Sequence, residues 1–284
     1  MANPATGDPE LPKSRRHTQS GGFFRPGAGP PAKIQLEQTG PANFKMLCQL
    51  GYQDSHFAEP FIVAPDIETF RTDLTSVPSL FQWLVPSIGV HLSAALIHDG
   101  LIYAPKEGKT YIGPDVSREQ ADRVFRDGMR DLGTPLIRRW VIWTAVTVAT
   151  VLSSPKYKAR WRATVFLTIG IVIALGVMAT LNLFNVWHGV PWMGHRSLVA
   201  QLALGALFAA IIPIVLCALW GHLWRAGLIL GWALAFLIHV TVAVAIVFGI
   251  YLVLESVASL FDHRGPSIKR NLGVVDKEDT YAAS

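Results

Sequence analysis

Long apolar runs dominate the second half of the chain, whereas the first half mixes apolar and polar positions. Three runs, at residues 163–184, 198–220 and 226–254, contain no Asp, Glu, Lys or Arg. Each is long enough to cross about 30 Å of hydrocarbon as a helix. The pattern therefore predicts three transmembrane helices over these residues.

Three conspicuously polar side chains interrupt these runs, namely Asn182, Gln201 and His239. A neutral amide or imidazole inside a membrane helix either bonds to a neighbouring helix or lies on a functional pathway. No ionisable partner is visible in the other runs, which favours the inter-helix hydrogen bond.

The remainder of the chain divides by composition. Residues 1–40 combine Gly, Pro and Ser with scattered charge and no sustained period, which is typical of a disordered arm. Residues 41–153 have the composition of a small globular domain. A basic linker at 154–162 precedes the membrane segment at 163–256, and a polar tail follows at 257–284.

Short periodic runs predict the elements of the globular domain. "FKMLCQLGYQ" and "PFIVAP", separated by the polar "DSHFAE", predict two strands joined as a hairpin. "LFQWLVP" and "HLSAALIHDGLIYAP" are helical in pattern, and "SREQADRVFRDGMRDLG" predicts a helix with a capping box at its start. We expect residues 136–152 to form an amphipathic or buried helix rather than a fourth span. The fold class is an α+β domain followed by an all-α anchor of three transmembrane helices.

Charge and composition place the chain in a membrane. The sequence is 51% hydrophobic and 16% charged, which is apolar for a soluble protein of 284 residues. Basic residues cluster at 156–162, whereas the loop at 185–197 carries only Arg196. The positive-inside rule then makes the domain cytoplasmic. A fourth span would move the domain to the other side.

Other functional classes find little support in the sequence. The two cysteines, Cys48 and Cys217, do not indicate a disulfide framework. There is no glycine-rich phosphate loop, paired-cysteine metal site or GxSxG motif. No basic helix interleaved with aromatic residues suggests nucleic acid, so we expect membrane lipid as the partner.

The adjacent residues His98 and Asp99 are the candidate chemical centre. On a helix their side chains project about 100° apart, so each needs its own partner. His98 lies among apolar residues and needs an acceptor for its ring N–H, which Asp122 on the following helix could supply. A carboxylate that fixes the tautomer leaves the other ring nitrogen as a general base. Alternatively, Asp122 is stabilised by the positive N-terminal end of its helix dipole, and His98 is a structural core histidine whose hydrogen bonds are made within the core.

Two further carboxylates could bind a hard cation. Asp99, and separately Asp73 in "RTDLTSVP", are candidate oxygen ligands for calcium. No coordinating loop surrounds either of them, and Asp73 could equally cap a turn.

Three motifs resemble one known family. "FRTDLTSVPSLFQWLVP", "AALIHDGLIY" and "SREQADRVFRDGM" occur in the order found in the phage- and prophage-associated domain of unknown function 1353. The resemblance covers residues 43–152 and excludes the membrane segment. One departure is that the family's tyrosine falls four residues after the histidine, where this chain has Ile102 and then Tyr103.

The His-Asp pair followed by an aspartate on the next helix is also similar to prokaryotic-type phospholipase A2. That resemblance implies that His98 is a general base, Asp99 a calcium ligand and Asp122 the carboxylate that orients His98. The chain lacks the disulfides and the calcium loop of that enzyme.

Two functions remain open. The first is a membrane-anchored hydrolase that acts on a phospholipid or another ester at the bilayer surface. The second is a non-enzymatic phage or prophage membrane protein, acting in lysis, host exclusion or virion association, whose domain binds a partner.

Overall fold

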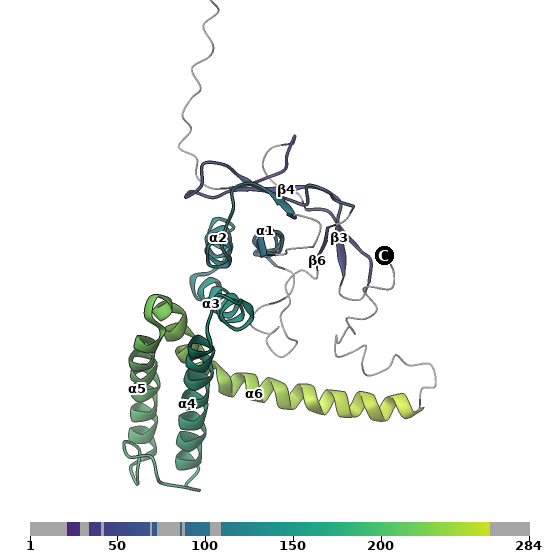
Figure 1. Cartoon of the computed structure of the whole chain (residues 1–284). Helices are drawn as coiled ribbons and strands as arrows, with labels where there is room; N and C mark the ends of the chain where they lie inside the picture. Colours follow the sequence, from purple (N-terminus) through teal and green to yellow (C-terminus); the bar gives the residue numbers. More distant parts are fainter. Residues whose placement is uncertain are drawn as a thin grey trace, which may run out of the picture.

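The computed structural model describes residues 22–28, 34–40, 43–68, 70–72, 86, 89–102 and 109–261. Six strands come first along the chain and helices follow, as the sequence predicts, except that β7 lies between α1 and α2. In Figure 1 the strands, α1 and α2 lie on one side of α3, and the paired helices α4 and α5 lie on the other.

Two small antiparallel sheets form the β part of the domain. One sheet has the order β1 (Gly22–Phe24), β4 (Leu50–Gln53), β5 (Phe61–Val63), β7 (Tyr111–Ile112). The other has the order β2 (Leu36–Gln38), β3 (Phe44–Met46), β6 (Arg71–Thr72). The predicted hairpin is confirmed as β4 and β5, in which Gly51 faces Ile62. The run "FKMLCQLGYQ" is nevertheless divided, because its first part is β3 of the other sheet.

The expectation of a disordered arm over residues 1–40 is wrong for two segments. Residues 22–24 form β1 on β4, and residues 36–38 form β2 on β3. Packing explains the difference: the ring of Phe23 lies 4.5 Å from that of Tyr52, and the ring of Phe24 fills the space above Gly51. These long-range aromatic contacts outweigh a local composition that favours disorder.

Two helices pack against the first sheet. Helix α1 (Leu92–Ile102) lies directly on β5, since a Cβ atom at Gly100 would stand 2.7 Å from Cγ2 of Val63. Helix α2 (Arg118–Asp131) begins at Ser117, and the predicted capping box with Gln120 is present. Their shared core includes Leu96, Ile97, Ala121 and Val124.

Helix α3 (Leu136–Ser153) packs against two different parts of the chain. Ile142 packs with Phe125 and Met129 of α2, whereas Trp143 and Val151 pack with residues of the helices that follow. The expectation of an amphipathic or buried helix agrees with this packing. By length and composition alone, α3 is also long and apolar enough to cross a membrane.

The remaining helices are the apolar part of the chain. Helix α4 (Ala159–Leu183) is followed by α5 (Leu198–Cys217), the short η2 (Ala218–Leu223) and α6 (Trp224–Phe261). Within the described residues, three helical runs could cross a membrane: Leu136–Ser153, Ala159–Leu183 and Leu198–Ser259. The last run holds two of the predicted spans, which are separated by a break at Gly221 with φ 50° and ψ −121°. Glycine alone adopts this conformation readily.

A polar contact joins the domain to the apolar helices. Oε1 of Glu119 on α2 accepts hydrogen bonds from Nζ of Lys156 at 2.7 Å and from the hydroxyl of Tyr157 at 2.5 Å. Partial burial raises the pKa of Glu119, but the two hydrogen bonds and the nearby positive charges together lower it below its ordinary value. Burial and the bond to Glu119 raise the pKa of Tyr157.

We expect Gly100→Ala to destabilise the domain by about 1–3 kcal/mol, because the new methyl group overlaps Val63. Gly170→Ala on α4 is the matched control, since its Cβ meets nothing within 4 Å. Thermal unfolding of the detergent-solubilised chain, followed by circular dichroism, measures both variants. Equal midpoints for Gly100→Ala and wild type would contradict the close approach of α1 to β5.

We expect Glu119 to make stability depend on pH. Because its folded pKa lies below its ordinary value of 4.5, its contribution is present above 4.5 and is lost as pH falls through the folded pKa. Glu119→Gln should therefore be less stable than wild type at pH 7, and the difference should shrink on acidification to about pH 3.5. Glu59→Gln, at an exposed position, is the control. A difference that stays constant with pH would count against the ionised contact.

Candidate functional site

His98 and Asp122 meet between α1 and α2. Nε2 of His98 lies 2.8 Å from Oδ1 of Asp122, and the two residues are 6% and 1% exposed. The contact that the sequence suggested is therefore present. Its catalytic role remains a prediction.

Small residues allow the two helices to approach closely enough for this contact. A Cβ atom at Gly128 of α2 would lie 3.3 Å from Cβ of Ala94 on α1. Phe125, one turn after Asp122, stacks on the imidazole of His98 with ring centroids 4.9 Å apart and planes at 23°. The ring of His98 is thus held by a carboxylate at its edge and an aromatic ring on its face.

The hydrogen bond assigns different roles to the two ring nitrogens. An ionised Asp122 can only accept, so the proton of neutral His98 lies on Nε2 and Nδ1 is left to take up a proton. Oδ2 of Asp122 is buried and has no hydrogen-bond partner among the described residues.

The negative charge of Asp122 also reaches Tyr157, which lies between α3 and α4. Burial and the bond to Glu119 are the main causes of the raised pKa of Tyr157, and the charge of Asp122 adds to them. The site between α1 and α2 therefore lies within electrostatic reach of the contact that joins the domain to the apolar helices.

Asp99 has a different environment from His98, as the helical geometry predicts. Its Oδ2 accepts a hydrogen bond of 2.8 Å from the hydroxyl of Thr72 on β6. The structure therefore brings His98 together with Asp122 and separates both from the bond made by Asp99. The candidate residues Asp73 and Tyr103 lie outside the described residues.

Of the two candidate calcium ligands, Asp99 lies within the described residues and Asp73 lies outside them. Calcium requires six to eight oxygen ligands, and Asp99 is one carboxylate whose Oδ2 is already bonded to Thr72. Calcium binding by Asp99 and Asp73 stays a prediction from the sequence.

A second polar cluster has the residue types of a metal site, but a protein cation fills it. Ligand atoms of Asp54, His56 and Asp127 lie within 4.8 Å of one another. The guanidinium of Arg123 donates to both oxygens of Asp54 at 3.3 and 3.2 Å, to Nδ1 of His56 at 2.7 Å and to Oδ2 of Asp127 at 3.2 Å. The cluster is an ion-pair network that ties α2 to the loop after β4.

This network was hard to predict from the sequence. The only visible signal is the spacing of Arg123 and Asp127, four residues apart on a helix. Asp54 lies 69 residues away from Arg123, and nothing local connects them.

The polar residues of the apolar helices pair with one another. Nδ2 of Asn182 on α4 donates to Oε1 of Gln201 on α5 at 3.1 Å. His239 on α6 lies 3.2 Å from the hydroxyl of Thr180 on α4. The expectation of inter-helix hydrogen bonds is confirmed for all three predicted residues.

Comparison with known proteins identifies one part of the chain. Residues 45–146 match the model of a family described as protein of unknown function (DUF1353), which confirms the resemblance found in the three sequence motifs. The match begins in β3 and ends within α3, so α4, α5 and α6 lie outside it. Neither the curated proteins nor the solved structures contain a significant match.

We expect nitrogen-15 NMR of the histidine rings to find neutral His98 protonated on Nε2. In Asp122→Ala this preference should disappear, and the unfolding free energy should fall by about 1–3 kcal/mol because a buried donor loses its acceptor. The exposed His56, whose Nδ1 accepts from Arg123, should keep its spectrum and is the internal control. A wild-type His98 protonated on Nδ1 would contradict the assigned hydrogen bond.

Proposed function

We propose that this chain is an integral membrane protein whose domain hydrolyses a phospholipid or another ester at the membrane surface. His98 is the general base, and Asp122 positions it. The observation that carries the proposal is the 2.8 Å hydrogen bond between them, because it fixes one tautomer and reserves Nδ1 for proton transfer.

The chemistry needs only a water molecule and the ester. Nδ1 of His98 takes a proton from water while the water oxygen bonds to the ester carbonyl carbon. Asp122 stabilises the imidazolium that forms. When the carbon–oxygen ester bond breaks, the leaving alkoxide takes the proton from Nδ1, so the products are a carboxylic acid and an alcohol. No step of this proposal passes through calcium.

Apolar surface supports the membrane location. Phe166, Val199 and Val247, on α4, α5 and α6, are 63%, 77% and 68% exposed. Water does not favour so many large exposed apolar side chains, but a lipid bilayer does. We propose that residues 163–184, 198–220 and 226–254 span a bacterial inner membrane, with the basic residues at 156–162 and the domain on the cytoplasmic side.

The packing of α3 supports a substrate in the membrane surface. Helix α3 packs on α2 with one face and on the apolar helices with the other. The domain is therefore held against the bundle of α4, α5 and α6 rather than tethered by a long linker. This arrangement favours a substrate that lies in the membrane surface.

The alternative function rests on burial. His98 and Asp122 are almost fully enclosed, and Phe125 covers one face of the imidazole. A polar pair with these properties also suits a structural role, in which the domain of a phage or prophage membrane protein binds a partner without catalysis.

Fatty-acid release from mixed phospholipid liposomes distinguishes the two functions. Purified full-length protein is compared with His98→Gln and Asp122→Asn, in calcium and in a chelator. We expect His98→Gln to lose at least about 100-fold in rate, since general base catalysis contributes this much. His56→Gln, at an exposed histidine in the same domain, should keep full activity.

Asp122→Asn should lower the rate while leaving Michaelis constants unchanged, because it acts through His98 and does not bind substrate. No release by wild type above background, with or without divalent ions, would refute the hydrolase and favour the partner-binding function. Equal rates for wild type and His98→Gln would also refute it.

A further inference from the structure

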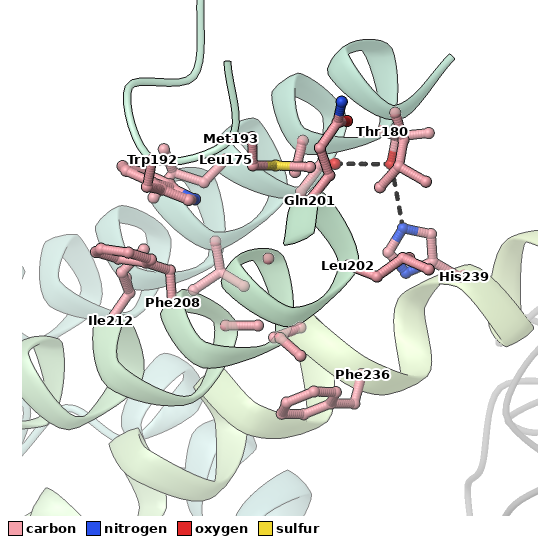
Figure 2. A pocket seen from close by; sticks show the side chains of 18 of the residues that line it. Leu175, Thr180, Trp192, Met193, Gln201, Leu202, Phe208, Ile212, Phe236 and His239 are labelled. Carbon is pink, nitrogen blue, oxygen red and sulfur yellow. Dashed lines mark hydrogen bonds between the residues drawn. The ribbon is translucent and has the colours of Figure 1, made fainter. Parts of the chain in front are cut away.

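A cavity of 380 Å³ lies between α4, α5 and α6. Figure 2 shows its lining side chains, which come from all three helices and from the loop before α5. Small residues create the space, because they leave room where larger side chains would fill the contact between helices: Gly176, Ala179, Gly205, Ala206, Ala209 and Ala235.

The cavity is elongated and polar at one end. Its wall on α5 runs from Gln201 to Pro213, which is about 18 Å at the helical rise of 1.5 Å per residue. Thr180, Gln201 and His239 supply the polar side chains of the lining, and Figure 2 shows them grouped together. The rest of the wall is apolar or aromatic, including Trp192 stacked on Phe208.

The hydrogen bonds at the polar end determine which ring nitrogen of His239 is the acceptor. The hydroxyl of Thr180 donates to the carbonyl oxygen of Gly176 at 2.8 Å, so it can only accept from His239. The ring proton of neutral His239 is therefore on Nε2. Nδ1 is then an acceptor, and it has no partner among the described residues.

The side-chain amide of Gln201, unlike Nδ1 of His239, is already bonded within the protein. Its Oε1 accepts from Asn182 at 3.1 Å, and its Nε2 donates to the carbonyl oxygen of Arg196 at 2.8 Å. Both polar atoms of the amide therefore already have a partner within the protein. His239 is thus the side chain of this end that can receive a ligand.

We propose that the cavity binds one single-chain lipid whose headgroup carries an O–H donor, and specifically a protonated fatty acid. The apolar wall takes the acyl chain, and the carboxylic acid donates to Nδ1 of His239. The cavity of 380 Å³, with a wall about 18 Å long on α5, offers an elongated apolar space for an acyl chain. This inference concerns the bundle and does not depend on hydrolysis by the domain.

The direction of the hydrogen bond gives the ligand its specificity. A fatty acid that is neutral inside the membrane offers the donor that His239 needs, whereas a methyl ester of the same length offers none. A phosphatidylcholine headgroup also lacks a donor. Binding should therefore rank palmitic acid above methyl palmitate and above phosphatidylcholine.

The test measures equilibrium binding of radiolabelled palmitic acid to the full-length protein in detergent. We expect saturable binding of one molecule per chain. His239→Phe keeps an aromatic ring but removes Nδ1, and it should weaken binding about 10-fold. Gly205→Leu fills the cavity and should abolish binding. Gly249→Leu on α6 is the matched control, because its Cβ meets nothing within 4 Å and it lies outside the cavity lining.

Thermal unfolding of each variant verifies the fold. If Gly205→Leu unfolds, Ala209→Leu, which narrows the same wall, replaces it. Methyl palmitate or phosphatidylcholine binding as tightly as palmitic acid would overturn the proposal. Unchanged palmitic acid binding in His239→Phe, or in the folded cavity-filling variant, would overturn it as well.

Discussion

The buried hydrogen bond between His98 and Asp122 is the constraint on which the arrangement of α1 and α2 depends. An ionised carboxylate that is 1% exposed is costly unless a donor compensates for its lost water, and the imidazole needs an acceptor for the same reason. The two helices must therefore cross where these side chains meet. Gly128 and Ala94 make that crossing possible, since larger residues would separate the helices.

Helix α3 extends this constraint to the apolar part of the chain. It packs on Phe125 and Met129 on one face, and its other face packs with Trp220 and Val165. Glu119, Lys156 and Tyr157 add a polar contact at the same junction. The domain and the bundle are thus joined by a shared helix, and the two proposals concern opposite sides of it: a water-activating pair in the domain and a lipid cavity in the bundle.

Structural features encoded by a pattern within one helix or strand were the most predictable. Apolar runs located α4, α5 and α6, and the spacing of Ser117 and Gln120 located the start of α2. The contact between His98 and Asp122 followed from the need of a buried imidazole for an acceptor on the next helix. Features that depend on distant residues were missed, because a local pattern does not encode them. The strand that contains Phe23 is stabilised by packing of this ring on Tyr52. Arg123 pairs with Asp54, which lies 69 residues away along the chain.

The break between α5 and α6 shows the same limit. Gly221 adopts a positive φ that a glycine permits, but the sequence does not reveal which of its many glycines will do so. The cavity likewise depends on how small residues of three helices align. Pro213 and Gly231, from different helices, lie in contact beside the cavity, although no local pattern in either helix indicates this contact.

A double-mutant cycle on unfolding free energy tests the central claim most directly. It compares wild type, His98→Ala, Asp122→Ala and the double variant of the full-length protein, all in the same detergent. The account predicts that each single variant is strongly destabilised and that the two effects couple by about 1–3 kcal/mol, because the first change already removes the bond. The account would be contradicted if the two single-variant effects summed to the double-variant effect within about 0.5 kcal/mol. In that case the two residues would not act as a unit, and neither the arrangement of the helices nor the proposed chemistry could rest on their hydrogen bond.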